Sequence, residues 1–277
     1  MHALDKWGFD VSIYSSRFKL NTFYIYNDEG VSESGVSNLK QTLSLDGTLA
    51  PHLIQEINAK QVINGKWKVN AAAFLMPGGA DLPYCKKLNG LGNKQIKEYV
   101  ESGGIYIGFC AGAYYGARYC DFHRGDHERG YEVLGERELS FFSGSAVGAT
   151  LAPYTYGSEN GARIADIEWV HDMSLCNRSS VYFNGGCHFP DIQHYDNVTV
   201  LARYNNKNAK GFPAIIECRV KKGKAILSGV HPEYSVENLQ RMYDTTSDNY
   251  QTLTKRIIPK LMDRSHVYLF RLIMSRI

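Results

Sequence analysis

Short apolar runs that stop at turns alternate with segments of helical spacing in the first half of the chain. The apolar runs, each short enough to be a buried strand, are residues 23–26, 71–76 and 105–108. The segments that carry apolar side chains at helical spacing are residues 34–45 and 93–101. Strands that alternate with helices predict an α/β fold, with a mostly parallel sheet flanked by helices. Functional loops should then gather at the carboxyl ends of the strands.

The second half of the chain predicts paired strands followed by helices. Residues 214–220 and 225–229 are apolar runs joined by a Lys- and Gly-containing turn, a pattern typical of a β-hairpin. From Val236 onward the apolar residues fall at helical spacing, with an expected boundary at Pro259. Because no repeat, low-complexity tract or linker divides the sequence, we expect a single domain over residues 1–277. Its core should span about residues 22–262, and residues 263–277 should form a helical tail.

The charge balance and the hydropathy pattern argue against several classes of protein. The 31 Lys and Arg residues against 28 Asp and Glu residues give a net charge of +3, a balance too even to drive nucleic-acid binding by counterion release. The longest apolar stretches are far below the ~18 residues needed to cross a bilayer, and nothing resembles an export signal. The 6 cysteines include no CxxC pair, which indicates reduced thiols. We therefore expect a cytoplasmic protein with no membrane or nucleic-acid partner.

The segment Gly108-Phe109-Cys110-Ala111-Gly112 follows a buried strand and matches the cysteine version of a nucleophile elbow. Glycine suits the positions two residues before and after the nucleophile, because side chains there would collide in the cramped turn. At the start of the following helix, unpaired N–H groups and the helix dipole favour thiolate over thiol. The alternative is a packed, inert core cysteine. The strand, both glycines and the expected helix favour the nucleophile.

His231-Pro232-Glu233 comes directly after the second strand of the expected hairpin. From that position an imidazole can reach a neighbouring cysteine while the carboxylate fixes its tautomer. The spacing suits this pairing, since residues i and i+2 of an extended segment point the same way. A lone histidine is more often structural than catalytic, so the assignment of His231 as a base depends on Cys110.

Two further glycine turns are expected to line the same pocket. Gly78 and Gly79 can direct backbone N–H groups into the cleft as an oxyanion hole, together with the amide of Ala111; the alternative is an ordinary tight turn. Asp81 is expected either to bind substrate or to cap the next helix. The glycine-rich end of residues 181–188 should supply pocket residues, namely Tyr182, Asn184, Gly185 and Gly186, with Cys187 and His188 as part of the wall.

A cluster of metal-ligand types lies in the segment after the elbow. Cys120, His123, Asp126 and His127 bunch within eight positions, but without the regular spacing of a zinc site. Residues 121–130 are strongly charged, so we interpret this segment as a solvated loop and expect no metal there.

Gly-Phe-Cys110-Ala-Gly together with His231-Pro-Glu233 resembles the class I glutamine amidotransferase-like superfamily. The resemblance implies a flavodoxin-like fold in which Cys110, His231 and Glu233 form a hydrolytic triad. Within that superfamily the chain is most similar to the N-terminal domain of eukaryotic-type biotin-protein ligases and its stand-alone relatives. The match covers roughly residues 24–261 and includes Met76-Pro-Gly-Gly-Ala-Asp-Leu-Pro-Tyr84, Leu88-Asn-Gly90, residues 108–116, Arg137-Glu-Leu-Ser-Phe-Phe142 and Tyr182-x-Asn184-Gly-Gly186.

The resemblance implies a fold without naming a reaction. The glycine- and arginine-rich biotinyl-adenylate loop of the ligase catalytic domain is not found in this sequence, and neither is a synthase domain that would receive ammonia. We therefore expect a cysteine-dependent hydrolase or amidase acting on a small-molecule amide, with no cofactor. The alternatives are a non-catalytic binding or regulatory module, and a partner subunit of a biotin-protein ligase or a synthase.

Overall fold

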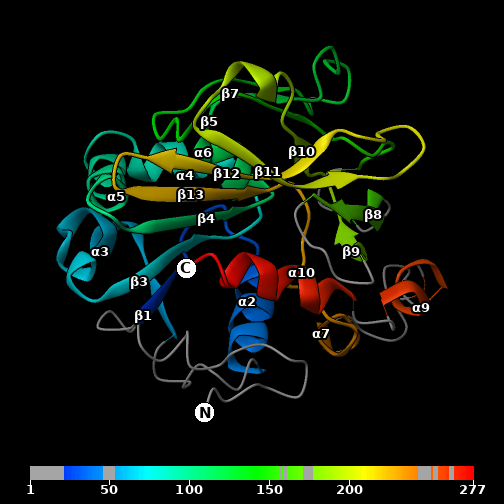
Figure 1. Cartoon of the computed structure of the whole chain (residues 1–277), viewed down its shortest axis with the longest axis horizontal. Helices are drawn as coiled ribbons and strands as arrows, with labels where there is room; N and C mark the ends of the chain where they lie inside the picture. Colours follow the sequence, from blue (N-terminus) through cyan, green and yellow to red (C-terminus); the bar gives the residue numbers. More distant parts are fainter. Residues whose placement is uncertain are drawn as a thin grey trace.

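The computed structural model describes residues 22–45, 54–155, 158, 161–170, 177–242, 251, 255–261 and 265–277. Within these residues the larger sheet has nine strands. Their order is β2 (Ile54–Ile57), β1 (Thr22–Tyr26), β3 (Ala71–Met76), β4 (Ile105–Phe109), β13 (Gly223–Ser228), β12 (Pro213–Val220), β11 (Val198–Tyr204), β8 (Arg163–Trp169) and β9 (Arg178–Phe183). This sheet crosses the middle of the molecule (Figure 1).

The two halves of the larger sheet differ in strand direction. From β2 to β13 every neighbouring pair is parallel, whereas from β13 to β9 every pair is antiparallel. The parallel half brings the carboxyl ends of β1, β3, β4 and β13 to one edge, where the loops of an α/β fold carry function. The predicted α/β class is confirmed, and the sheet is mixed because the second half of the chain is built largely from hairpins.

A smaller sheet lies beside the larger one. Within the described residues it has four strands, in the order β10 (Cys187–His188), β7 (Phe142–Gly148), β5 (Ala117–Phe122) and β6 (Val133–Glu136). It lies above the larger sheet in Figure 1, with α4 and α6 close beneath it. The chain enters it directly from the helix that follows Cys110, so this sheet borders the region of the predicted nucleophile.

Helices cover both faces of the larger sheet (Figure 1). On one side are α3 (Ala59–Asn64), α4 (Asp81–Leu88), α5 (Leu91–Glu101) and α6 (Ala111–Gly116). On the other are α2 (Glu33–Leu45) and α10 (Ser265–Met274), with α7 (Val236–Met242) and α9 (Ile258–Leu261) nearby. Two short 3-10 helices, η2 (Lys66–Val69) and η4 (Ile192–His194), complete the labelled elements. No helix in the described part of the chain is long and apolar enough to cross a membrane.

Alternation along the strands divides the core into two layers. In β1, Tyr24 and Tyr26 pack in the layer under α3, α4 and α5, while Phe23 and Ile25 pack in the layer under α2 and α10. Successive residues of a strand point to opposite faces, so these continuous apolar runs are what a sheet covered on both sides requires. The C-terminal helix belongs to the second layer, since Phe270 stacks on Phe109 with ring centroids 6.4 Å apart.

The expected elements correspond closely to those in the structure. β3 spans residues 71–76 as predicted, and β4, α2 and α5 each differ from the prediction by no more than two residues at either end. The hairpin is β12 and β13, and the boundary predicted at Pro259 falls at the start of α9. Proline suits the first turn of a helix because no intrahelical partner is needed there for its missing N–H.

Candidate active site

Cys110 lies at a sharp turn between β4 and α6. Its φ of 48° and ψ of −106° place a non-glycine residue in a strained backbone conformation. A Cβ added to Gly108 would lie 2.3 Å from the carbonyl oxygen of Gly112, and one added to Gly112 would lie 2.1 Å from that of Met76. Both glycines of the predicted elbow are therefore required, because the neighbouring backbone leaves no room for a Cβ at either position.

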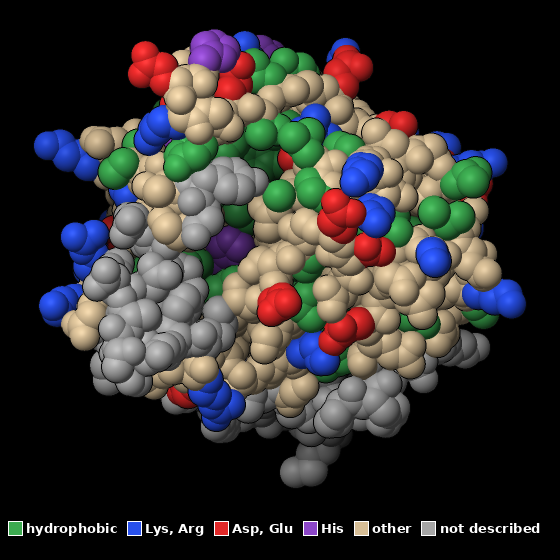
Figure 2. Space-filling view, turned by 180° about the vertical axis from the view of Figure 1, so that it is seen from behind, with side chains coloured by type: hydrophobic (Ala, Val, Ile, Leu, Met, Phe, Trp, Pro, Cys, Tyr) green, Lys and Arg blue, Asp and Glu red, His purple; other side chains and the backbone are tan. Residues whose placement is uncertain are grey.

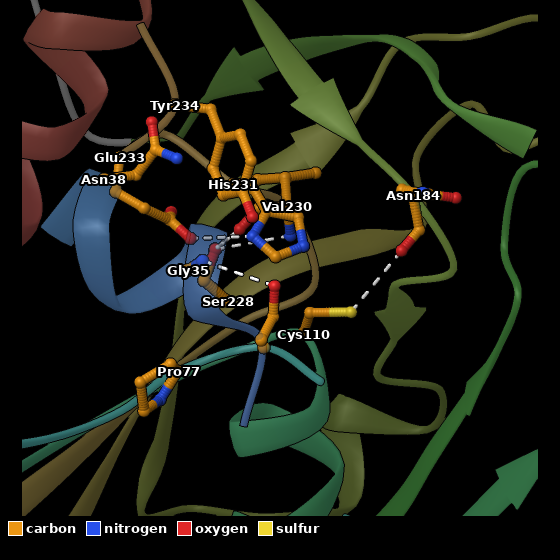
Figure 3. A network of polar contacts seen from close by, with 12 residues as sticks. Gly35, Asn38, Pro77, Cys110, Asn184, Ser228, Val230, His231, Glu233 and Tyr234 are labelled. Carbon is orange, nitrogen blue, oxygen red and sulfur yellow. Dashed lines mark hydrogen bonds and ion pairs between the residues drawn. The ribbon is translucent and has the colours of Figure 1, made fainter. Parts of the chain in front are cut away.

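His231 and Glu233 follow the neighbouring strand β13 and form a buried pair. The Nδ1 atom of His231 lies 2.7 Å from Oε1 of Glu233, and Glu233 is fully buried. Because Nδ1 faces the carboxylate, Nε2 is the ring nitrogen left for Cys110, and the two side chains are neighbours, since a Cβ on Gly78 would lie close to both. Figure 3 shows the imidazole between the glutamate and the cysteine. The sulfur of Cys110 also lies 3.6 Å from the carbonyl oxygen of Asn184, to which the thiol can donate.

The surroundings of His231 favour the protonated ring. Burial by itself lowers the pKa, because it removes water from the imidazolium. The charge of Glu233 and the hydrogen bond and charge of Cys110 outweigh burial and raise the pKa of His231 from 6.5 to about 10. The imidazolium is then the main form at neutral pH. Because folding raises the pKa of His231, protonation of its ring stabilises the folded protein. This stabilisation is complete below pH 6.5 and is lost as the pH rises through about 10.

Replacing Glu233 with Gln is expected to lower the pKa of His231 below about 10, because the amide keeps the shape of the side chain and removes its charge. The measurement is an NMR titration of the His231 ring protons in the wild-type and variant proteins. His188 is an internal control, since burial lowers its pKa to about 4 and it does not line the cavity. An unchanged His231 titration in the variant would show that Glu233 does not stabilise the imidazolium.

A cavity of about 510 Å³ opens beside these residues, within the size range of small-molecule sites. Figure 2 shows a hollow in the molecular surface with a histidine side chain inside it. Of the predicted site residues, those that line the cavity are Gly78, Gly79, Asp81, Cys110, Ala111, Tyr182, Asn184, Gly185 and His231. Glu233 lies behind His231 (Figure 3). The structure thus brings most of the predicted residues together, while their catalytic roles stay predictions.

Three residues at the cavity have backbone amides without an acceptor in the described part of the chain. Among the hydrogen bonds of the described residues, none is donated by the amides of Gly78, Gly79 or Ala111. Ala111 is the first residue of α6, where an amide has no intrahelical acceptor. A Cβ on Gly78 would lie 2.8 Å from Cε1 of His231 and 3.5 Å from Cβ of Cys110. This segment therefore contacts both the predicted nucleophile and its partner.

The sequence predicts Gly185 and Gly186 as pocket residues and Cys187 and His188 as part of the wall; of these four, Gly185 alone is among the residues that line the cavity. Gly186 does not line the cavity, and a Cβ there would lie 1.7 Å from the carbonyl oxygen of Gly229, so its glycine is needed for chain packing. Cys187 and His188 form β10 of the smaller sheet, outside the cavity lining. Gly185, with a φ of 80°, turns the chain away from the cavity after Asn184.

Asp81 makes a buried ion pair at the cavity wall. Its Oδ2 accepts a hydrogen bond of 2.7 Å from Nε of Arg137, and both side chains are almost fully buried. The alternative that Asp81 caps the next helix is wrong, because the N-cap of α4 is Ala80 and Asp81 is the first helical residue. A role of Asp81 in substrate binding stays a prediction.

Hydroxyl groups around the cavity are the main feature that the sequence did not reveal. Ser32 and Ser34 lie 2.6 Å apart, oxygen to oxygen, and Ser34 lies 2.8 Å from the hydroxyl of Tyr234. Tyr234 stacks on Tyr182 at 4.6 Å and packs edge-on to His231. Two features of the sequence could have indicated these hydroxyl groups: Tyr234 directly follows Glu233, and the two serines come shortly after the first strand. The cavity lining also includes the aromatic residues Tyr114, Phe122 and Tyr154.

The loop around His123 makes polar contacts within itself. Nδ1 of His123 lies 3.1 Å from Asp126, and Nδ1 of His127 lies 3.3 Å from Glu132. No group of three or more potential metal-binding side chains occurs among the residues that the structure describes. The prediction of a loop here is confirmed by the turns that link β5 to β6.

Comparison with known proteins identifies the family. A family model described as "Biotin-protein ligase, N terminal" matches residues 21–277. The chain belongs to this family. It is 37% identical over 213 residues to a biotin–protein ligase of Schizosaccharomyces pombe, covering 77% of this chain and 33% of the ligase. The chain thus spans about one third of the length of that relative.

Two other comparisons give a second sequence relative and a structural neighbour. An uncharacterised protein of Chlamydia muridarum is 31% identical over 256 residues, covering 86% of this chain and 96% of that protein. A glutamine amidotransferase from Thermotoga maritima superposes with a TM-score of 0.54 at 11% identity, covering 92% of this chain and 97% of that one. At this identity the likeness shows the fold alone, and that fold is the amidotransferase-like one expected from the sequence.

Proposed function

We propose that the chain is a cysteine-dependent amidase that hydrolyses the C–N bond of a small-molecule amide. The observation that carries the proposal is the buried Glu233–His231 pair, whose imidazole lies beside Cys110 at a cavity. A strained cysteine, an oriented histidine and unpaired amides are the parts that nucleophilic acyl transfer requires.

The reaction would run through a thioester. The Cys110 thiolate attacks the amide carbonyl carbon, and the N–H groups of Gly79 and Ala111 stabilise the oxyanion. His231 donates the proton on Nε2 to the leaving nitrogen, so the C–N bond breaks and ammonia or an amine departs. Water then attacks the thioester and gives a proton to His231. The C–S bond breaks, which releases the acid and restores the thiolate–imidazolium pair.

The test is ammonia release from a panel of primary amides. The panel contains glutamine, asparagine and biotinamide, the last because one relative is a biotin–protein ligase. At least one amide is expected to release ammonia with the wild-type protein, and Cys110→Ala is expected to lower that rate by about 10³-fold or more, as loss of a nucleophile does elsewhere. Cys85→Ala is the control, because Cys85 does not line the cavity.

Equal rates for the wild-type protein and Cys110→Ala on every amide would contradict the proposal. That result would favour the alternative of a binding or regulatory module that keeps the triad geometry without turnover. A partnership with a biotin-protein ligase or a synthase stays a prediction, and co-purification with the ligase and its effect on biotin transfer would test it.

A further inference from the structure

The peptide between Gly78 and Gly79 is held on one side by two donors. The carbonyl oxygen of Gly78 accepts a hydrogen bond of 3.0 Å from the backbone amide of Ser32 and one of 3.1 Å from the hydroxyl of Tyr84. The same hydroxyl lies 3.3 Å from the carbonyl oxygen of Pro77. These contacts fix the plane of the peptide, since a carbonyl that accepts from two directions cannot rotate freely.

The fixed carbonyl also fixes the direction of the Gly79 amide. This peptide bond is trans, and in a trans peptide the N–H points opposite to the C=O. The Gly78 carbonyl points toward Ser32 and Tyr84, so the Gly79 N–H points to the other side, that of the Gly78 α-carbon, where a Cβ added to Gly78 would lie close to His231 and Cys110. Among the described residues, the Gly79 amide also donates no hydrogen bond, and Gly79 lines the cavity.

Tyr84 is suited to this role because it is immobilised. Its side chain is fully buried and packs edge-on against Tyr26 and Tyr115, with ring centroids 5.6 and 5.7 Å away. The main chain fits closely around the hydroxyl, since a Cβ on Gly79 would lie 2.9 Å from it. A preorganised donor of this kind costs no reorganisation when charge develops during the reaction.

We infer that Tyr84 is a positioning residue for the oxyanion hole: its hydroxyl holds the Gly78 carbonyl so that the Gly79 N–H faces the acyl oxygen of the substrate. This inference rests on the proposed amidase function. It predicts that Tyr84 affects steps that place negative charge on an acyl oxygen, and leaves other reactions of Cys110 unchanged.

The experiment compares two reactions of Cys110 in the wild-type protein and in Tyr84→Phe. p-Nitrophenyl acetate acylates the cysteine through a tetrahedral oxyanion, releasing p-nitrophenolate, whereas iodoacetamide alkylates the sulfur by displacing iodide at carbon. Loss of a direct oxyanion donor costs about 10²–10³-fold. For a residue that only positions the donor we expect acylation to slow about 10-fold and alkylation to change less than about 2-fold.

Tyr99→Phe is the matched control, because Tyr99 is also buried and its hydroxyl donates to the carbonyl of Ala71, at the opposite end of β3. It should leave both rates unchanged. Replacing Tyr84 with 3-fluorotyrosine keeps the ring and strengthens the donor, so acylation at or above the wild-type rate is expected even if Tyr84→Phe folds poorly. Equal slowing of both reactions in a folded Tyr84→Phe, or slowing of neither, would overturn the role of Tyr84. If wild-type protein is acylated no faster than Cys110→Ala, the proposed amidase itself fails, and the inference with it.

Discussion

Iodoacetamide at pH 6 is expected to alkylate Cys110 about 10- to 100-fold faster than an unfolded cysteine, because a protonated His231 beside the sulfur stabilises the negative charge of the attacking form. The positive charge comes from His231, because its pKa of about 10 keeps the imidazole ring protonated at pH 6 and at neutral pH. The rate for an unfolded cysteine falls about tenfold per pH unit below ~8.5. Mass spectrometry of the labelled peptide measures the rate for Cys110.

The other described cysteines provide the contrast. Burial raises the pKa of Cys85 to about 11 and raises those of Cys120, Cys187 and Cys218 further. Cys110→Ala is therefore expected to remove the fast phase of labelling, and Cys85→Ala to retain it. A wild-type Cys110 that labels no faster than the same cysteine in the denatured protein would contradict an activated nucleophile, whatever the amide panel shows.

The local part of the site could be predicted from the sequence because the elbow is a local structure. The backbone that crosses between Gly108, Gly112 and Met76 leaves no room for a Cβ, so glycine marks the turn in the sequence itself. His231 and Glu233 could also be paired because they lie two residues apart, although Pro232 and Glu233 form a turn, closed by the Tyr234 amide on the His231 carbonyl, and not the extended segment that the sequence predicted. This pair lies beside Cys110 because β4 and β13 are parallel neighbours in the sheet. The order of strands and helices in the sequence indicates a parallel sheet but does not determine which strands are neighbours.

The remaining part of the fold depends on contacts that leave little trace in the sequence. β7 carries Gly144 and Gly148 among small polar residues, a weak strand pattern, and its neighbours in the smaller sheet come from distant segments. Likewise, Tyr84 resembles any apolar residue of an amphipathic helix until its hydroxyl is seen beside Gly78. The placement of Cys187 and His188 outside the cavity lining has the same origin, since the glycine at position 186 packs tightly against the backbone of Gly229.

Gly112→Ala is expected to destabilise the protein by about 3 kcal/mol or more, because overlap with a buried backbone cannot be relieved by a rotamer change. The added Cβ would lie 2.1 Å from the carbonyl oxygen of Met76. That carbonyl ends β3, and the amide of Gly112 donates to the next carbonyl, that of Pro77, at 3.2 Å. The substitution would therefore push the elbow away from the Gly78–Gly79 segment, and chemical denaturation with tryptophan fluorescence measures the loss.

Gly35→Ala is the matched control for the cost of a methyl group on a buried glycine. Gly35 lies within α2, and the nearest atom to its added Cβ, on Pro77, is 3.5 Å away, an ordinary contact. Alanine in a helix interior stabilises by about 0.5–1 kcal/mol relative to glycine, so this variant should be neutral or more stable. Equal stabilities for the two variants would mean that the elbow adapts to a side chain at position 112. In that case the fold would not require glycine at position 112, although the sequence has it there.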